Sequence, residues 1–319
     1  MFEMTVAADI GSAFTRIAVG ERTVADESRA ALDPSDPRRV LAFGSAAGRL
    51  LNASEAYPVR DGISDIDLTA LMLKRLALDA AKRHTLFGMS LAVALPACVR
   101  GTERDAAFAV GRAAGFRRIA AVEGLLAGAV GAGLDIGGET ASMIVDIGRS
   151  SVGIMTIANG GAVASSRAGF GSAAFDRSII AWLAENKGVL IGARTAERLK
   201  KHSGEACVRV GGNDSSSGRS QRTEITGEEL SLAMLPAMQR LITAIASAMN
   251  ELPPEAAADL LDNGITLIGG GAKLHGLNSA LSDALGVPVR TAEDPANAII
   301  NGMRLVMRGE TELQAVGIK

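Results

Sequence analysis

Apolar residues recur along the chain with two different spacings, which predict alternating strands and helices. Short continuous runs such as LAVALP at 91–96 are typical of buried strands. Longer segments, DLTALMLKRLALDAAKRH at 67–84 and TERDAAFAVGRAAG at 102–115, place apolar residues at helical spacing. Thr102 is the expected N-cap of the second helix. Strands that alternate with helices in this way favour an α/β fold.

One arrangement of apolar and polar residues occurs twice. Residues 7–20, AADIGSAFTRIAVG, and residues 144–157, IVDIGRSSVGIMTI, each contain an apolar run, Asp-Ile-Gly, small polar residues and a second apolar run. The distance from Asp9 to Asp146 is 137 positions. Each copy is typical of a β-hairpin. A repeat at this distance predicts two similar structural units.

The repeat divides the chain into two α/β domains, expected at 1–140 and 141–308, that face each other across a cleft. Two polar regions, at about 21–60 and 202–222, interrupt the pattern, and we expect both to lie on the surface. Residues 309–319 are expected to form a loose tail.

The tip of each hairpin combines two features that suit a phosphate group. Gly11 and Gly148 make the backbone N–H groups of the turns approachable, and a concave set of N–H groups binds anions. Asp9 and Asp146 come just before the turns, where a carboxylate can hold a hydrated divalent cation. Two such tips would grip a phosphate chain and its Mg²⁺ from both sides. Asp-Ile-Gly is also a common tripeptide at strand ends, so the motif alone does not establish this function.

A third candidate is the glycine triplet in GITLIGGGAKLHGL, residues 264–277. An apolar strand leads into Gly269–Gly271, and a helix is expected to follow. Three glycines let the backbone lie flat against a planar or phosphate-bearing ligand, next to a helix N-terminus. A tight packing turn would explain the triplet equally well. In series with the two hairpins, however, the triplet favours a nucleotide site.

Composition narrows the classes of function. The chain has 319 residues, 48% of them hydrophobic and 21% charged, which is enough for a sizeable core. A net charge of −2 and only 3% aromatic residues argue against nucleic acid as a partner. Abundant Gly and Ala favour close packing of helices. The two cysteines and three histidines show no metal-ligand spacing, which favours a reduced cytosolic compartment. Neither a signal peptide nor a membrane span is expected.

Four stretches of the chain resemble a known family. DIGSAFT, VDIG with its hairpin, LIGGGAKLHGL and AEDPANAIINGM occur in the order of the actin-like ATPase superfamily, and they look most like the MreB/Mbl family of bacterial rod-shape proteins. The likeness runs from Val6 to about Met307. It implies an α/β protein with the actin-like ATPase fold, in which two similar domains enclose a nucleotide cleft. The polar regions 21–60 and 202–222 would be its outer subdomains, reduced in size.

The resemblance also implies a function. ATP and Mg²⁺ would occupy the cleft, and ATP-bound subunits would join head to tail into filaments. The protein would be a cytoskeletal scaffold for cell-wall synthesis and cell shape. It would be cytoplasmic and peripheral at the inner face of the cell membrane. The implied partners are further copies of the chain, a fully active relative, the cell-wall synthesis machinery and the membrane surface.

The binding residues of the family can be carried over position by position. Asp9 and Asp146 would hold Mg²⁺ through water. Glu197 and Lys200 match a pair that contacts the nucleoside. They are three positions apart and share a helix face, which fits a ribose clamp and fits a surface salt bridge equally well. The residues implied to bind nucleotide are Asp9, Gly11, Ser12, Ala13, Phe14, Asp146, Gly148, Arg149, Ser150, Ser151, Glu197, Lys200, Gly269, Gly270, Gly271, Ala272 and Lys273.

The chain departs from the family where the chemistry occurs. The family has Glu-Glu-Pro ahead of one helix and uses the second glutamate to orient the attacking water, whereas here Glu123 is followed by Gly124. A carboxylate one residue away is turned by about 100° on a helix. Arg149 and Ser150 replace two glycines of the second hairpin. We therefore expect weak or absent hydrolysis, with Glu123 and Ser151 as weak candidates for a catalytic role.

Leu86 and Phe87 lie between a polar helix end and a core strand, in HTLFGMSLAVALP. The resemblance places a membrane-inserting apolar pair at this position. Packing of both side chains under a neighbouring helix is the alternative, and the sequence favours neither.

Two other functions stay open for the whole chain. One is a fully active cytoskeletal ATPase, in which other groups orient the water. The other is a small-molecule kinase of the same superfamily, which is disfavoured because the family-like stretches run through both units.

Overall fold

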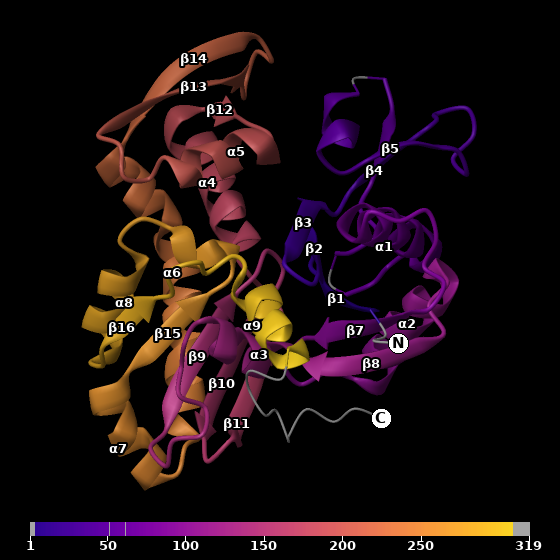
Figure 1. The fold of residues 1–319 in the computed structure, drawn as a ribbon. Coiled ribbons are helices and arrows are strands. Elements are labelled where there is room, and N and C mark those ends of the chain that lie inside the picture. Colours follow the sequence, from indigo (N-terminus) through magenta and orange to yellow (C-terminus); the bar gives the residue numbers. More distant parts are fainter. Residues whose placement is uncertain (1–3, 51, 61, 309–319) are drawn as a thin grey trace.

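The computed structural model describes residues 4–50, 52–60 and 62–308. It contains two α/β domains, each with a five-stranded inner sheet and a three-stranded outer sheet (Figure 1). The strand orders of the inner sheets are β3-β2-β1-β7-β8 and β11-β10-β9-β15-β16. The predicted α/β class is confirmed. The expected tail, 309–319, lies outside the described residues.

The elements of the two domains follow one another along the chain. The first domain has β1 (Met4–Ile10), β2 (Phe14–Val19), β3 (Arg22–Glu27), β4 (Ala30–Leu32), β5 (Val40–Phe43), η1 (Gly44–Arg49), β6 (Ser54–Ala56), α1 (Ile66–Ala81), β7 (Met89–Leu95), α2 (Gly101–Ala114), β8 (Arg118–Glu123) and α3 (Gly124–Gly131). The second has β9 (Ser142–Ile147), β10 (Val152–Ala158), β11 (Gly161–Ala168), α4 (Ala173–Lys187), β12 (Val189–Leu190), α5 (Ala193–Lys201), β13 (Cys207–Asp214), β14 (Ser220–Thr226), α6 (Gly227–Asn250), α7 (Pro254–Asn263), β15 (Ile265–Ile268), η2 (Gly270–Lys273), α8 (Leu277–Leu285), β16 (Val289–Thr291) and α9 (Ala298–Met307).

The two inner sheets have the same topology. In each sheet an antiparallel meander, β1-β2-β3 or β9-β10-β11, is extended by two parallel strands, β7-β8 or β15-β16. The repeat in the sequence is therefore a repeat of the fold. It carries Asp9, near the end of β1, and Asp146, near the end of β9, to the same cleft.

Helices α3 and α9 join the two domains. α3 follows the first inner sheet but also packs on β9 and β10 of the second, while α9 packs on β1 and β2 of the first. A Cβ atom at Gly131 would lie 1.9 Å from the carbonyl oxygen of Ala298, and one at Gly302 would lie 1.7 Å from that of Ala127. Only glycine permits so close an approach. This is the close helix packing that the composition predicted.

The outer sheets do not match the expected ranges. β3 lies within the predicted outer region 21–60 but pairs with β2, so the first outer sheet, β5-β4-β6, spans only 30–56. The first outer sheet therefore covers only part of the predicted outer region. In the second domain, 202–222 forms most of the β13-β14 hairpin of a sheet that spans 189–226. In β13, exposed residues alternate with more buried ones such as Val210. The polar composition of the segment hides this strand pattern in the sequence.

The predicted N-cap of α2 is wrong by two positions. The helix begins at Gly101, and Arg100 rather than Thr102 is its N-cap. The carboxylate of Glu103 accepts a hydrogen bond from the backbone N–H of Arg100 at 3.0 Å. This acid thereby satisfies an N–H group that the helix itself leaves unpaired.

Helix α6 is, among the described residues, the one helix long and apolar enough to cross a membrane by length and composition. In the fold it packs against α4, α8, β11 and β14. Leu230, Leu241 and Ile245 are buried on its inner face. The helix runs without a break through Pro236. We therefore describe α6 as a core helix of the second domain.

Candidate functional site

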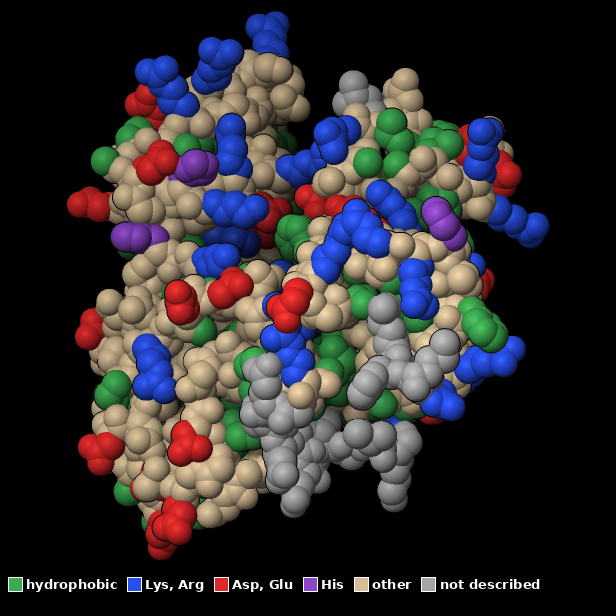
Figure 2. All heavy atoms as spheres, in the orientation of Figure 1, with side chains coloured by type: hydrophobic (Ala, Val, Ile, Leu, Met, Phe, Trp, Pro, Cys, Tyr) green, Lys and Arg blue, Asp and Glu red, His purple; other side chains and the backbone are tan. Residues whose placement is uncertain are grey.

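The two domains enclose a cleft with a volume of about 650 Å³. Its mouth opens between the two outer subdomains, where acidic and basic side chains lie close together (Figure 2). There Arg194 of α5 forms an ion pair with Glu55 of β6, which connects the second domain to the first. Among the residues predicted to bind nucleotide, those that line the cleft are Asp9, Gly11, Ser12, Ala13, Phe14, Asp146, Gly148, Arg149, Ser150, Ser151, Glu197, Lys200, Gly269, Gly270, Gly271 and Lys273.

The turns of the two hairpins are closed by the same hydrogen bond. The N–H of Gly11 donates to the carbonyl oxygen of Phe14 at 3.0 Å, and the N–H of Gly148 donates to that of Ser151 at 3.0 Å. A Cβ atom would lie 2.9 Å from the acceptor oxygen at Gly11 and 3.1 Å from it at Gly148. The tight turn therefore requires glycine at Gly11 and favours it at Gly148.

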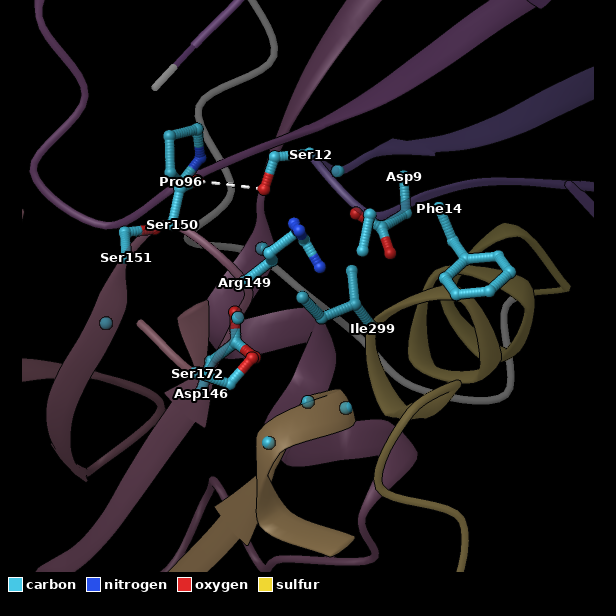
Figure 3. A pocket seen from close by; sticks show the side chains of 18 of the residues that line it. Asp9, Ser12, Phe14, Pro96, Asp146, Arg149, Ser150, Ser151, Ser172 and Ile299 are labelled. Carbon is cyan, nitrogen blue, oxygen red and sulfur yellow. Dashed lines mark hydrogen bonds between the residues drawn. The ribbon is translucent and has the colours of Figure 1, made fainter. Parts of the chain in front are cut away.

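The two hairpin tips touch each other across the cleft. The hydroxyl groups of Ser12 and Ser150 are hydrogen-bonded at 2.8 Å (Figure 3). Behind the second tip, the N–H of Ser172, at the start of α4, donates to the carbonyl oxygen of Gly148 at 2.8 Å. Behind the first, the hydroxyl of Ser28 donates to the carbonyl oxygen of Gly11 at 2.6 Å. Each turn is thus held from behind, and its tip faces the other domain.

Two carboxylates lie beneath the tips. Burial raises the pKa of Asp9, and the guanidinium of Arg16 opposes that rise. Burial, together with repulsion from Asp9, raises the pKa of Asp146 to about 7. The two acids therefore sense each other's charge, and a cation between them would relieve the repulsion.

Arg16 is a cleft residue that the sequence reasoning missed. It lies directly opposite Asp9 in the register of β1 and β2, and its guanidinium is 3.6 Å from the Asp9 carboxylate. It also donates to the side-chain oxygen of Asn297 at 2.9 Å. A signal was present in the sequence, because a residue paired with an inward-facing Asp9 across a hairpin must itself face inward.

The residues of the cleft fit a hydrated divalent cation. Asp9 and Asp146 provide two partly buried carboxylates that face one cavity. Across the described ranges, no group of three or more His, Cys, Asp or Glu side chains could hold a metal ion. The remaining ligands would have to be water or phosphate oxygens, which suits Mg²⁺.

Arg149, which takes the place of a glycine of the family pattern, points into the cavity from the tip of the second hairpin (Figure 3). Its guanidinium is 3.6 Å from the carboxylate of Glu197 on α5. Glu197 also pairs with Lys201 at 3.0 Å. Burial raises the pKa of Glu197, but the hydrogen bond and charge of Lys201, with the charge of Arg149, lower it by more.

Lys200 lies in the cleft wall and is paired with Asp176 rather than with Glu197. Its ammonium group is 2.7 Å from the carboxylate of Asp176 and donates to the carbonyl oxygen of Ser172 at 3.2 Å. Both members of the Lys200–Asp176 pair are almost fully buried. Neither interpretation of the Glu197 and Lys200 spacing is therefore complete: both residues line the cleft, and each is paired with a different residue.

The glycine triplet serves packing and exposure at once. A Cβ atom at Gly269 would lie 2.2 Å from a carboxylate oxygen of Asp146, and one at Gly271 would lie 2.4 Å from the side chain of Ile147. Gly270 has no such neighbour within 4 Å and leaves its backbone open to the cavity. Ala272 is buried and is not one of the residues that line the cleft, so its contact with nucleotide stays a prediction.

Glu123 is not a residue of the cleft. It is the last residue of β8, and one of its carboxylate oxygens is buried without a hydrogen-bond partner. Burial raises its pKa. Gly124 does line the cleft, where a Cβ atom would lie 2.7 Å from the carbonyl oxygen of Leu95. Glu123 therefore does not line the cavity, whereas Ser151 does, and a catalytic role of either residue stays a prediction.

Leu86 and Phe87 do not act as a pair. Leu86 is buried in the core of the first domain, whereas Phe87 is 76% exposed on the loop before β7. Of the two interpretations, packing in the core holds for Leu86, whereas Phe87 is exposed at the surface.

Known proteins share both the sequence and the fold of this chain. A family model described as MreB/Mbl protein matches residues 3–315. The cell shape-determining protein MreB of Escherichia coli (strain K12) is 31% identical over 95% of this chain and 92% of its own length. Mbl of Bacillus subtilis (strain 168) is 27% identical over 96% of each.

Comparison with solved structures agrees with the sequence matches. MreB 5 of Spiroplasma citri bound to AMPPNP superposes with a TM-score of 0.91, at 25% identity over 97% of each chain. The MamK double helical filament has a TM-score of 0.81 at 16% identity over 96% of this chain and 98% of its own, which bears on the fold alone. The fold is therefore actin-like, and the chain belongs to the MreB/Mbl family of cell shape-determining proteins.

Proposed function

We propose that the protein is an MreB-like cytoskeletal subunit that binds ATP in the cleft and self-assembles into filaments. The observation that carries this proposal is the convergence of two equivalent hairpin turns on one cavity, which the carboxylates of Asp9 and Asp146 also line. AMPPNP and ADP are bound in the two structures of Spiroplasma citri MreB 5 that resemble this chain. Membership of the MreB/Mbl family supports self-assembly, which the test below examines directly.

The cleft residues divide between the parts of the nucleotide. The phosphates would lie at the two tips, where backbone N–H groups and the hydroxyls of Ser12 and Ser150 can donate. The nucleoside would lie toward Gly270 and Lys273. Asp9 and Asp146 would hold Mg²⁺ through water, and the ion would neutralise part of the phosphate charge.

We infer that hydrolysis is weak or absent. No carboxylate projects from position 124, and a glutamate there would meet the backbone of β7. Glu103 lines the cleft, but it is engaged by Arg167 at 2.8 Å and by the N–H of Arg100. A general base must lie within hydrogen-bond reach of the attacking water. The acid of the family pattern is absent at position 124, and Glu103 is occupied by its own partners.

Filament formation and hydrolysis can be measured on the same preparation. Negative-stain microscopy with and without ATP is expected to show filaments that require nucleotide. Single-turnover hydrolysis is expected to be much slower than that of Escherichia coli MreB measured alongside. A comparable rate would overturn weak hydrolysis, and a monomer that binds nucleotide but never assembles would overturn the filament proposal.

We propose that the protein is cytoplasmic and lies at the inner face of the cell membrane, where it scaffolds cell-wall synthesis with a more active relative. Phe87 supports membrane contact, because it is the most exposed large apolar side chain among the described residues. Phe87→Ser is expected to reduce co-sedimentation with anionic liposomes. Leu261→Ser, which changes another exposed apolar residue on α7, is the matched control. Equal binding of the wild type and the two variants would contradict a role of the Phe87 loop in membrane contact.

A further inference from the structure

Each hairpin contributes one arginine to the phosphate end of the cleft. Arg16 stands on β2 directly opposite Asp9, and Arg149 stands in the turn of the second hairpin. Both line the cavity. The two closed turns are equivalent, so Arg149 occupies the position that Ser12 has in the first hairpin. The repeated turn itself therefore does not require a positive charge at the position of Arg149.

Arg16 is a fixed charge. Its side chain is 14% exposed and is held by the Asp9 carboxylate at 3.6 Å, by Asn297 at 2.9 Å and by the ring of Phe14 at 5.5 Å. A guanidinium group has five N–H donors, and these contacts occupy only part of them. The remaining donors of Arg16 can bind an anion in the cavity while the contact between Arg16 and Asp9 is kept.

Arg149 is a charge that can turn toward a ligand. Its contact with Glu197 is long, at 3.6 Å, and Glu197 has a closer partner in Lys201 at 3.0 Å. Movement of Arg149 onto a phosphate would therefore leave Glu197 paired. Guanidinium groups match phosphate oxygens in geometry and bind them with two parallel hydrogen bonds.

We propose that Arg16 and Arg149 together take over the charge-neutralising part of a divalent cation, so that the cleft binds ATP without an obligatory metal ion. The inference rests on the proposed function of the cleft as a nucleotide site. The two guanidinium groups carry the same total charge as one divalent ion. Arg16 also lies against Asp9 and partly satisfies a carboxylate that would otherwise depend on the cation.

The test is a titration of the nucleotide-free full-length protein with ATP by calorimetry, once in excess Mg²⁺ and once in EDTA. The wild-type Kd is expected to rise by less than about tenfold in EDTA. Charge-assisted hydrogen bonds contribute enough for loss of one arginine to weaken binding by about tenfold or more. Arg149→Gly and Arg16→Gln are therefore expected to raise the Kd by at least that factor in EDTA and by less in Mg²⁺.

Arg209→Gln is the matched control, because Arg209 is 89% exposed on β13 and does not line the cleft. Thermal unfolding of each variant checks its fold, and the wild-type comparison stands even if one variant does not fold. Binding in Mg²⁺ that disappears in EDTA would overturn the inference and leave the nucleotide site intact. Absence of wild-type binding in both conditions would overturn the proposed function and this inference with it. An equal loss in Arg209→Gln would also overturn the inference, since the effect would then be one of net charge.

Discussion

Replacement of Glu123 by Gln is expected to stabilise the protein at neutral pH. One oxygen of this carboxylate is buried without a hydrogen-bond partner, and burial raises its pKa above the ordinary value of 4.5. The N–H of Leu125 offsets only part of that rise. Glutamine has nearly the same shape but cannot ionise, so the variant removes the buried charge and retains the packing.

The magnitude follows from the charge of the ionised carboxylate. Glutamine leaves a polar atom at the same unpaired place, so the variant removes only the cost of the buried charge, and the partial exposure of Glu123 places that cost at the lower end of the range of about 1–3 kcal/mol for a buried group without a partner. We expect a gain of about 1 kcal/mol, which is about 2 °C in Tm for a chain of this length. Because the folded-state pKa is raised, the stability contributed by the protonated acid is complete below 4.5 and is lost as the pH rises through the folded-state value. The gain of the variant should therefore appear at neutral pH and vanish in acid.

Thermal unfolding at neutral pH and below pH 4.5 measures both halves of this expectation. Glu293→Gln, which changes an exposed glutamate before α9, is the control, and its Tm should shift by less than about 1 °C. A gain that is equal at both pH values, or absent at neutral pH, would refute the attribution to burial. A loss of ATP hydrolysis in Glu123→Gln would support a catalytic role of Glu123 despite its place outside the cleft.

Three further substitutions test the framework of the cleft. Gly124→Glu puts a Cβ atom 2.7 Å from a backbone oxygen, so we expect a loss of about 2 kcal/mol by thermal unfolding and no gain in single-turnover hydrolysis. Gly302→Ala should cost about 3 kcal/mol because it separates α3 from α9, whereas Gly161→Ala, where a Cβ atom meets nothing within 4 Å, should be nearly neutral in the same assay. Lys200→Met leaves the buried carboxylate of Asp176 without its cation and should cost about 3 kcal/mol in chemical denaturation.

The two hairpins and their equivalence were predictable from the sequence, because the residues that determine each turn are local. A tight turn closed onto Phe14 or Ser151 demands glycine at the first position, and the acid just before it follows from strand alternation. Two copies of such a pattern imply two copies of the turn. The actin-like fold was implied by the resemblance of these motifs, in this order, to a known superfamily, and the structural relatives confirm it.

Where the sequence did not predict the burial of a residue, that burial depends on contacts between distant segments. Leu86 and Phe87 are adjacent and equally apolar, and only the position of the first domain's core buries one and exposes the other. Ala272 directly follows the three glycines of the triplet but is buried in the core. Arg16 could have been predicted, because the closed turn fixes the register of β1 and β2 and places this residue opposite Asp9.

The repeat also shows where the cleft is free to change. At Gly11, Gly148, Gly269 and Gly271 an added Cβ atom would lie within 3.1 Å of a neighbouring atom, so the fold itself retains these glycines. The positions between the turn glycine and its acceptor carry side chains that face the cavity or the opposite tip and have no such restraint. A cation there leaves the turn closed by the same hydrogen bond as in the other hairpin. The chemistry of the phosphate end can therefore diverge without loss of the fold, which is why Arg149 can alter metal dependence while the actin-like framework stays intact.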